Sequence, residues 1–471
     1  MNLEVKASPT KHFFVDMLTR DIALKDAILD LIDNCLDGIL RHAKPKRGVG
    51  DLERYAGHSV SLTINRRGFE IVDDCGGISR KIATETAFML GRVPERVERL
   101  PTVGVYGIGM KRAIFKLGED ATVHSHPVGE AAYKVHISPK WLSDDTAWTL
   151  QLEDAPSELE HPGTRITVKK LKPEIARAFD DGNSPFVEEL RNEIAHTYAL
   201  IIQRGFAIAV NGRRVEPVGT TLRISPKAAS KGAKIAPFVV TARIKNVDVT
   251  VMVGFYRALA TEAELEVVDG GPVQSRSSDH AGVTIVCNDR VVLYKDKTVL
   301  TGWGTGAVPR YHNQFIAITG IVTFQSDTPE ALPLNSTKRG VDLGTDVYQF
   351  ALDQLKDGLK RFTDFTNKWK QRERETTADF KETKAASPAE VIKSIPAGSW
   401  SQPRRHKQEK LRKFVPVLPA PVGESSRVRI AFTRDLSEVE LVRSFYFDDD
   451  QVGASEVGER CFEDSLSKAR K

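Results

Sequence analysis

Residues 26–39, with the sequence DAILDLIDNCLDGI, place apolar and acidic side chains on opposite faces when they are arranged as a helix. Positions three and four apart share a face, so an apolar arc and an acidic arc result. A solvated helix would normally interleave basic residues with these acids, and Lys25 is the only base close by. The pattern indicates a cation at this face, the alternative being an acidic helix that faces water. The acidic arc consists of Asp26, Asp30, Asp33, Asn34 and Asp37.

Two glycine-rich stretches follow this helix. Residues 71–79 (IVDDCGGIS) predict a strand that ends in acidic residues and a tight Gly-Gly turn. Residues 103–118 (VGVYGIGMKRAIFKLG) place three glycines just before the start of a helix. Such a loop lets backbone N–H groups approach a phosphate at a helix N-terminus. Together the three stretches predict a phosphate-bearing ligand.

The order of acidic helix, strand with turn, and glycine loop resembles the Bergerat-fold ATPases, the GHKL group. That group includes gyrase, MutL, the ninety-kilodalton heat-shock chaperone, MORC proteins and sensor histidine kinases. Its first motif is E-x-x-x-N-x-x-D, and Asp30, Asn34 and Asp37 occupy those positions. The chain therefore has Asp where the family usually has Glu, which implies a shorter catalytic base and either a closer water or slow turnover.

Three further motifs of that group are present in the same order. Asp73 and Gly77 match D-x-G-x-G, with Cys75 in place of the first glycine. We expect Gly76 to supply the tight approach that this glycine normally allows. The remaining matches are Gly104, Gly107 and Gly109 for G-x-x-G-x-G, and Gly163 with Thr164 for a Gly-Thr pair that opens a strand.

The resemblance implies ATP and Mg²⁺ as cofactors and suggests a role for each residue. Asn34 would offer an amide oxygen to Mg²⁺, and Asp30 would orient the water that attacks the γ-phosphate. Asp73 would accept from the adenine amino group, which predicts ATP over GTP. Lys338, in the segment 332–342 (LPLNSTKRGVD), would reach the terminal phosphate, the alternative being a solvated turn residue. Asp37 would mainly support the helix and the glycine loops. Lys111 would add charge beside the phosphates, or it could equally be a solvated residue of the first helical turn. The other expected nucleotide-site residues are Gly77, Gly104, Gly107, Ile108, Gly109, Met110 and Thr164.

Composition sets the broad class. A chain of 471 residues with 41% hydrophobic and 28% charged residues is expected to be globular, with more than one domain. It has no apolar run of membrane-spanning length and no secretion signal, so we expect a cytoplasmic protein with no membrane partner. The net charge of +5 permits nucleic-acid binding without requiring it. The cysteines argue against a disulfide framework or a zinc site because they lie far apart without a CxxC motif: Cys35, Cys75, Cys287 and Cys461.

We expect an α+β fold that begins with a Bergerat-fold ATPase α/β sandwich and continues with a transducer-like domain. The transducer likeness is to the second domain of ribosomal protein S5, as in topoisomerases, MutL and MORC proteins. The expected parts are 1–183 for the ATPase domain with an N-terminal strap and an ATP lid at about 80–105, 184–345 for the transducer-like domain, 346–374 for a long amphipathic helix, 375–426 for a basic, proline-rich linker, and 427–471 for a small C-terminal module with strand character.

The favoured interpretation is a slow ATPase that forms a homodimer with ATP and closes as a clamp on DNA or on a protein partner. The pattern is most similar to stand-alone bacterial, MORC-like and topoisomerase VI B-like members. One alternative is a non-hydrolysing ATP-binding scaffold, suggested by the Asp30 substitution, and another is an Hsp90-like chaperone. DNA contact would use the basic run 404–413, the alternative being a solvated linker, and the C-terminal region would contact a protein partner.

Overall fold

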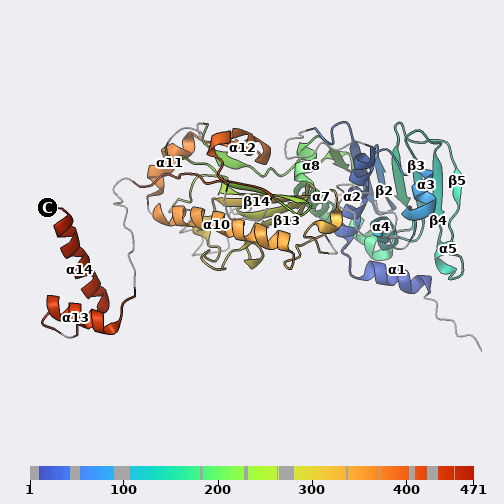
Figure 1. The fold of residues 1–471 in the computed structure, drawn as a ribbon. Helices are drawn as coiled ribbons and strands as arrows, with labels where there is room; N and C mark the ends of the chain where they lie inside the picture. Colours follow the sequence, from blue (N-terminus) through green and yellow to red (C-terminus); the bar gives the residue numbers. More distant parts are fainter. Residues whose placement is uncertain are drawn as a thin grey trace, which may run out of the picture. The chain divides into compact units, whose positions relative to one another are not determined.

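The computed structural model describes most of the chain as two compact units, residues 1–420 and 421–471. Helices and strands alternate through the first unit (Figure 1), so the expected α+β class is confirmed. The described residues are 10–42, 53–89, 107–180, 184–226, 232–261, 264, 280–335, 338–370, 372–402, 409–421, 433–449 and 451–470.

An eight-stranded sheet forms the first half of the larger unit, in the order β5-β4-β3-β6-β2-β1-β7-β8. Its neighbours are antiparallel except β1 and β7, which run parallel. In β1 the apolar Val60, Leu62 and Ile64 are buried and alternate with more exposed residues, which is the pattern of a sheet covered on one face. The strands are β1 Ser59–Asn65, β2 Gly68–Asp73, β3 Ala121–His126, β4 Tyr133–Ile137, β5 Leu152–Asp154, β6 Gly163–Val168, β7 Ala207–Val210 and β8 Arg213–Arg214.

Helices cover the buried face of this sheet. The apolar residues of α2 and α4 share one core with the inward-facing residues of the central strands. A short π-helical turn at Ala83–Ala87 extends α3. The helices of this half are α1 Lys11–Arg20, α2 Leu24–His42, α3 Arg80–Ile82, α4 Gly109–Leu117, α5 Pro139–Ser143, α6 Pro173–Phe179, α7 Pro185–Thr197 and α8 Ala199–Gln203.

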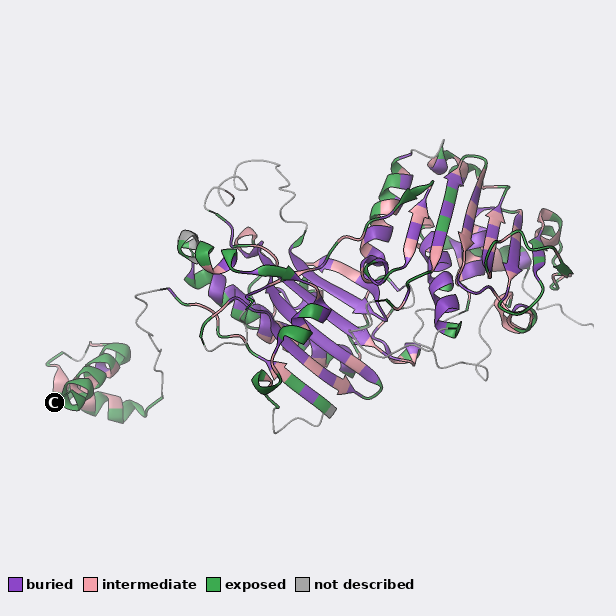
Figure 2. Cartoon of the chain, turned by 90° about the horizontal axis from the view of Figure 1, so that it is seen from above, coloured by how far each residue is buried: buried purple, intermediate pink, exposed green. Residues whose placement is uncertain are grey.

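A second sheet of six strands follows, in the order β13-β12-β14-β11-β10-β16. Nearly every residue of its central strands is buried (Figure 2), since α10 covers one face while β9, β15 and α12 cover the other. The elements are β9 Leu222–Ile224, β10 Phe238–Ile244, β11 Val247–Phe255, β12 Gly282–Cys287, β13 Arg290–Asp296, β14 Ile318–Gln325, α10 Asp346–Lys368, α11 Glu373–Lys381, β15 Lys384–Ala386, α12 Pro388–Ser394 and β16 Glu409–Phe414.

The structure corrects the expected layout in two places within this unit. The boundary at 183/184 does not separate the two sheets, because β7 and β8 complete the first sheet by pairing with β1. The expected linker at 375–426 contains α11, β15, α12 and β16, and β16 is an edge strand because it pairs with β10. Local composition does not reveal such pairing, since the partner strand lies far away in the sequence.

Two strand assignments also differ from the sequence pattern. Residues 283–293, whose apolar side chains predict a single strand, form two strands joined by a turn at Asn288–Asp289. In the smaller unit, Ser444–Tyr446 belongs to helix α13, although its aromatic residues favour a strand. That unit consists of α13 Leu436–Tyr446 and α14 Ala454–Ala469.

Some expected features fall outside the described residues. These are residues 90–106, which hold most of the expected lid and Gly104, residues 1–9 of the strap, and residues 404–408 of the basic run. Within the described parts of the chain, every helix is too short or too polar to cross a bilayer.

The close approach of β6 to the end of β2 predicts the effect of one substitution. A Cβ atom at Gly163 would overlap the carbonyl oxygen of Asp73. We expect Gly163→Ala to lower the free energy of unfolding by about 2–3 kcal/mol, because backbone must move. Gly398→Ala is the matched control, since its Cβ would meet no atom within 4 Å, and it should change stability by less than about 0.5 kcal/mol. Urea unfolding followed by circular dichroism measures the free energy of unfolding of both variants. Equal losses of stability would contradict the close packing of Gly163 against Asp73.

Candidate functional site

Helix α2 carries one exposed amide among buried carboxylates. Every residue from 27 to 40 is buried except Asn34. Asp30, one turn before Asn34, and Asp37, one turn after it, are 4% and 7% exposed. The carboxylates of the acidic arc therefore do not form a water-facing surface. This excludes the alternative interpretation of an acidic helix that faces water. Asn34 is exposed between these buried acids, and its role as a Mg²⁺ ligand stays a prediction.

Asp30 is engaged by two cations that come from different parts of the chain. Its Oδ2 pairs with Arg112 of α4, and its Oδ1 lies 3.1 Å from the Nζ atom of Lys338. The N-terminus of α4 lies directly beside it, because a Cβ atom at Gly109 would come within 3.3 Å of the Asp30 side chain. The first and third motifs of the sequence thus meet at this carboxylate.

Asp33 accepts more buried contacts than the sequence suggests. Arg290 of β13 donates through Nε to Oδ1 at 2.9 Å, and the Nζ of Lys338 lies 2.9 Å from Oδ2. The hydroxyl of Tyr198 lies 2.9 Å from Oδ1. Burial by itself raises the pKa of Asp33, but the charges of Arg290 and Lys338 outweigh it and lower the pKa below its usual value. Asp33 is therefore a charged carboxylate in the interior.

Lys338 is held in a buried and strained position. It is 9% exposed and its φ of 57° lies in the left-handed region, which non-glycine residues seldom adopt. Burial lowers the pKa of its ammonium, but Asp33 and Asp30 raise it above the ordinary value. The alternative of a solvated turn residue does not fit this position. The proposed contact with a terminal phosphate stays a prediction.

Asp73 lies at the end of β2 with a partly desolvated carboxylate. The backbone N–H of Cys75 donates to its Oδ1 at 2.9 Å, and the Cys35 thiol lies 3.4 Å from its Oδ2. Burial raises the pKa of Asp73 to about 6, which these hydrogen bonds and one from the backbone of Thr164 only partly offset. Thr164 is the register partner of Asp73 on β6 and is itself buried. A carboxylate that has lost part of its hydration is a good acceptor for an amino group.

The turn after Asp73 packs against α2 through a glycine on each side. A Cβ at Gly38 would come within 2.6 Å of the carbonyl oxygen of Cys75. Gly76 and Gly77 have φ values of 94° and 70°, so both adopt a conformation that favours glycine. Cys75 fills the place of the first motif glycine without blocking this turn, and its side chain is buried.

The N-terminus of α4 has no side-chain cap among the described residues. Gly107 has a φ of 63° and Ile108 occupies the N-cap. Gly109 and Met110 form the first turn. Uncapped N–H groups beside a loop are suited to an anion such as a phosphate. This arrangement fits a triphosphate.

Lys111 of the same turn has a different neighbourhood from the one expected. Its Nζ donates to the carbonyl oxygens of Ala87, at 2.8 Å, and of Gly107. Burial lowers the pKa of this lysine to about 8. Lys111 is thus neither solvated nor aimed into open space, and it ties the end of the π-helical turn to the glycine loop.

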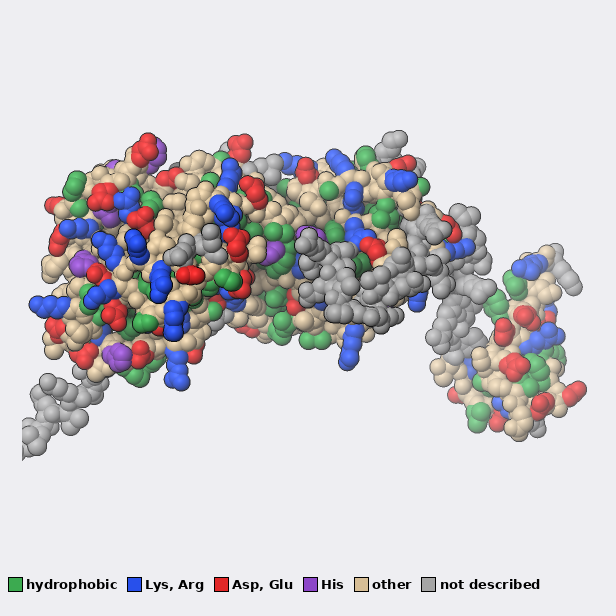
Figure 3. Space-filling model, turned by 180° about the vertical axis from the view of Figure 1, so that it is seen from behind, with side chains coloured by type: hydrophobic (Ala, Val, Ile, Leu, Met, Phe, Trp, Pro, Cys, Tyr) green, Lys and Arg blue, Asp and Glu red, His purple; other side chains and the backbone are tan. Residues whose placement is uncertain are grey.

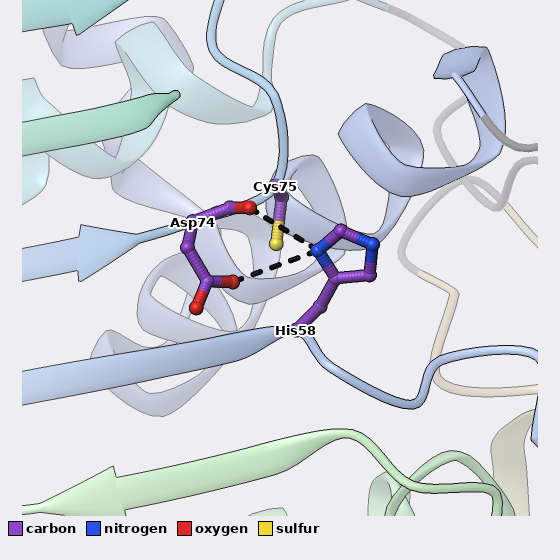
Figure 4. A group of neighbouring side chains, drawn as sticks. All are labelled: His58, Asp74 and Cys75. Carbon is purple, nitrogen blue, oxygen red and sulfur yellow. Dashed lines mark hydrogen bonds and ion pairs between the residues drawn. The ribbon is translucent and has the colours of Figure 1, made fainter. Parts of the chain in front are cut away.

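His58, Asp74 and Cys75 bring three metal-binding residue types together beside the same turn (Figure 4), with their ligand atoms within 4.8 Å of one another. Nδ1 of His58 faces both the carbonyl and, at 3.7 Å, the carboxylate of Asp74. The carboxylate already accepts the N–H and the hydroxyl of Ser59, each at 2.6 Å. Burial raises the pKa of the Cys75 thiol, which opposes the thiolate that a metal requires. The cluster fits a structural role for Asp74 better than a metal centre.

Several residues at the site were not identified from the sequence. They are Asp33, for which only membership of the acidic arc was recognised, and Arg112, Tyr198 and Arg290. Arg290 follows an Asn-Asp pair between two apolar runs, and that pair is a signal for a turn. The pairing with Asp33, 257 residues away, has no local signal.

Comparison with known proteins gives one finding. Residues 22–170 match the family model described as histidine kinase-, DNA gyrase B- and HSP90-like ATPase. No curated protein matches the chain. The matched range contains α2, the β2 turn, the start of α4 and the Gly-Thr pair of β6. Residues 22–170 thus belong to the GHKL superfamily of histidine kinase-, DNA gyrase B- and HSP90-like ATPases.

Proposed function

We propose that this protein binds ATP with Mg²⁺ between α2, the β2 turn and the N-terminus of α4, hydrolyses it slowly, and uses it to change the arrangement of its two sheets. The observation that carries the proposal is the contact of Lys338 with Asp30, two residues 308 positions apart. It brings a lysine from the segment between β14 and α10 to the acid of the family motif. Chemistry at α2 can then be coupled to movement of the second sheet.

The residues fit the ligand in three ways. Asp73 would accept the adenine amino group, with Thr164 beside it. Asn34 would give its amide oxygen to Mg²⁺, which bridges the phosphates and keeps most of its waters. Gly107, Ile108, Gly109 and Met110 would present backbone N–H groups to the triphosphate, and Gly77 and Asp37 would hold the turn and helix in place. Bound ATP would supply the phosphoryl group that is transferred to water, and catalysis would rest on positioning and charge.

Asp30 would orient the attacking water, and its surroundings support the slow turnover that we propose. Both of its oxygens are occupied by the cations of Arg112 and Lys338. A water molecule oriented by Asp30 would have to displace one of these two contacts. The same observation favours the second candidate function, an ATP-binding switch or scaffold that barely hydrolyses ATP.

The wider role that we propose is an ATP-dependent homodimer that acts as a clamp on DNA or a protein partner, in the manner of MORC-like and topoisomerase VI B-like proteins. The sequence resemblance of the second half to a transducer domain supports it, as does the family's tendency to dimerise. DNA remains a candidate partner only. The face seen in Figure 3 carries Lys and Arg side chains interspersed with Asp and Glu, instead of a continuous basic surface. The α13–α14 unit exposes Leu441 and Phe445, 73% and 78% exposed, which suits contact with a protein.

The pKa of Asp73 predicts how nucleotide affinity depends on pH. The carboxylate must be ionised to accept from adenine, and it gains a proton as the pH falls through about 6. We therefore expect affinity to be about tenfold lower at pH 5 than at pH 7. Calorimetry with ADP and Mg²⁺ measures this, with adenosine as a control that has no titrating phosphate. Asp73→Asn should abolish binding at both values, and binding that persists in this variant would place adenine elsewhere.

The two candidate functions differ in what Asp30 does. We expect Asp30→Asn to slow phosphate release by about 100-fold while ATP affinity stays within about threefold. Asp16→Asn, an exposed change on α1, is the control and should leave both unchanged. Equal background rates in all three proteins would favour the non-hydrolysing switch.

Dimerisation can be measured directly. We expect a non-hydrolysable ATP analogue with Mg²⁺ to convert the wild-type chain to a dimer in size-exclusion chromatography with light scattering. Asn34→Ala should stay in its nucleotide-free state because it lacks the Mg²⁺ ligand. A wild-type mass that does not respond to the analogue, at concentrations where calorimetry shows saturation, would rule out the clamp.

A further inference from the structure

The turn between β12 and β13 projects two opposite charges from the second sheet. Asn288 and Asp289 have φ values of 45° and 70°, so two consecutive residues adopt the left-handed conformation of a tight hairpin turn. Arg290 follows at once as the first residue of β13. Asp289 and Arg290 are 0% and 4% exposed. Both charges are therefore inside the protein, and each must have partners.

Asp289 is fixed by residues of the first half. The hydroxyl of Tyr55 donates to its Oδ2 at 2.9 Å, and Arg54 lies 3.3 Å from the same oxygen. Arg204, which follows α8, pairs with this carboxylate as well, and Gln325 donates to its Oδ1 at 2.6 Å. These contacts hold the turn in one position, so the residue that follows has little freedom.

Arg290 uses two sides of its guanidinium group for two different segments. Its Nε donates to Oδ1 of Asp33 on α2 at 2.9 Å. Its NH1 donates to the backbone carbonyl oxygen of Lys338 at 2.9 Å. One planar group thus joins the motif helix to the backbone of the residue that contacts Asp30. A lysine at position 290 has a single ammonium and could not reproduce this bridge.

Lys338 needs such a bridge because its backbone is strained. A left-handed conformation costs a non-glycine residue of the order of 1–3 kcal/mol and persists only where surrounding contacts impose it. The hydrogen bond from Arg290 is made to the carbonyl of this very residue. The Nζ atom of Lys338 then lies 2.9 Å from Asp33 and 3.1 Å from Asp30.

We propose that Arg290 is a positioning residue of the ATPase site: it sets the backbone of Lys338 and, through Asp33, the place of the lysine ammonium beside Asp30. This inference rests on the proposed ATPase function. A buried ion pair that serves packing alone can usually be replaced by apolar residues without loss of stability. Arg290 bonds both the Asp33 side chain and the backbone carbonyl of Lys338. Apolar replacements would not restore the positions that these two bonds impose.

The test is a double-mutant cycle on the full-length chain. We expect Arg290→Met to lower kcat for phosphate release to within about twofold of Lys338→Met, with the ATP dissociation constant within about threefold of wild type. The double variant should be no slower than Lys338→Met alone, since Arg290 acts through that lysine. Arg243→Met is the control, because this partly exposed arginine pairs only within the β10–β11 hairpin in the contacts described. Additive losses, or wild-type kcat in Arg290→Met, would overturn the proposal.

A second variant and a second measurement keep the result decisive. Removing Arg290 leaves Asp33 unpaired on one side, so the charge-balanced pair Arg290→Met with Asp33→Leu is made for the case in which the single variant does not fold. It should show the same fall in kcat. Hydrogen exchange of residues 338–345 should be faster in both variants than in wild type or Arg243→Met. If wild type releases no phosphate, the proposed hydrolysis fails, yet unchanged exchange in this segment would still overturn the positioning role and faster exchange would support it.

Discussion

Two carboxylates of helix α2 and two cations meet in a buried cluster, and the arrangement of the larger unit depends on their balance. Asp30, Asp33, Arg290 and Lys338 are each less than a tenth exposed. A charge in such surroundings costs several kcal/mol unless it is paired and hydrogen-bonded. Here each acid contacts at least one of the cations, and each cation contacts at least one of the acids. Separating the second sheet from α2 would take Asp33, Arg290 and Lys338 away from these ionic partners, so the contact is specific in geometry and sensitive to any change of charge.

Because of these contacts, the candidate site lies where helix α2 meets Arg290 of the second sheet and Lys338. A ligand with phosphate charges near Asn34 and the N-terminus of α4 would compete with Asp30 and Asp33 for Lys338. Ligand binding would therefore change the partners of the buried Lys338, and this change would be transmitted to the second sheet. Asp289, the residue before Arg290, contacts Arg54, Tyr55 and Arg204. These contacts hold the β12–β13 turn in place and so restrict the position of Arg290.

Asp73 illustrates a second kind of control, by desolvation. Its pKa of about 6 comes mainly from burial, and the hydrogen bonds from Cys75 and Thr164 keep it from rising further. The Cys75 backbone supplies one of these bonds, so the residue that departs from the family pattern still supports the acid. The carbonyl oxygen of Cys75 lies against Gly38 of α2, so the turn after β2 packs directly on the helix that carries the first motif.

Local patterns were enough to predict the α+β class, the acidic helix, the strand that ends at Asp73 and the Gly-Thr pair, because helical periodicity, strand alternation and glycine turns act over a few residues. The order of these motifs was also enough to indicate the ATPase superfamily. The sequence alone did not reveal that β7 joins the first sheet or that β16 completes the second, since strand pairing depends on residues far apart. Nor could it distinguish a solvated Lys338 from a buried one. The tertiary structure decided that point, because only folding brings Arg290 and Asp33 together, and the cost of burying their charges fixes where Lys338 must lie.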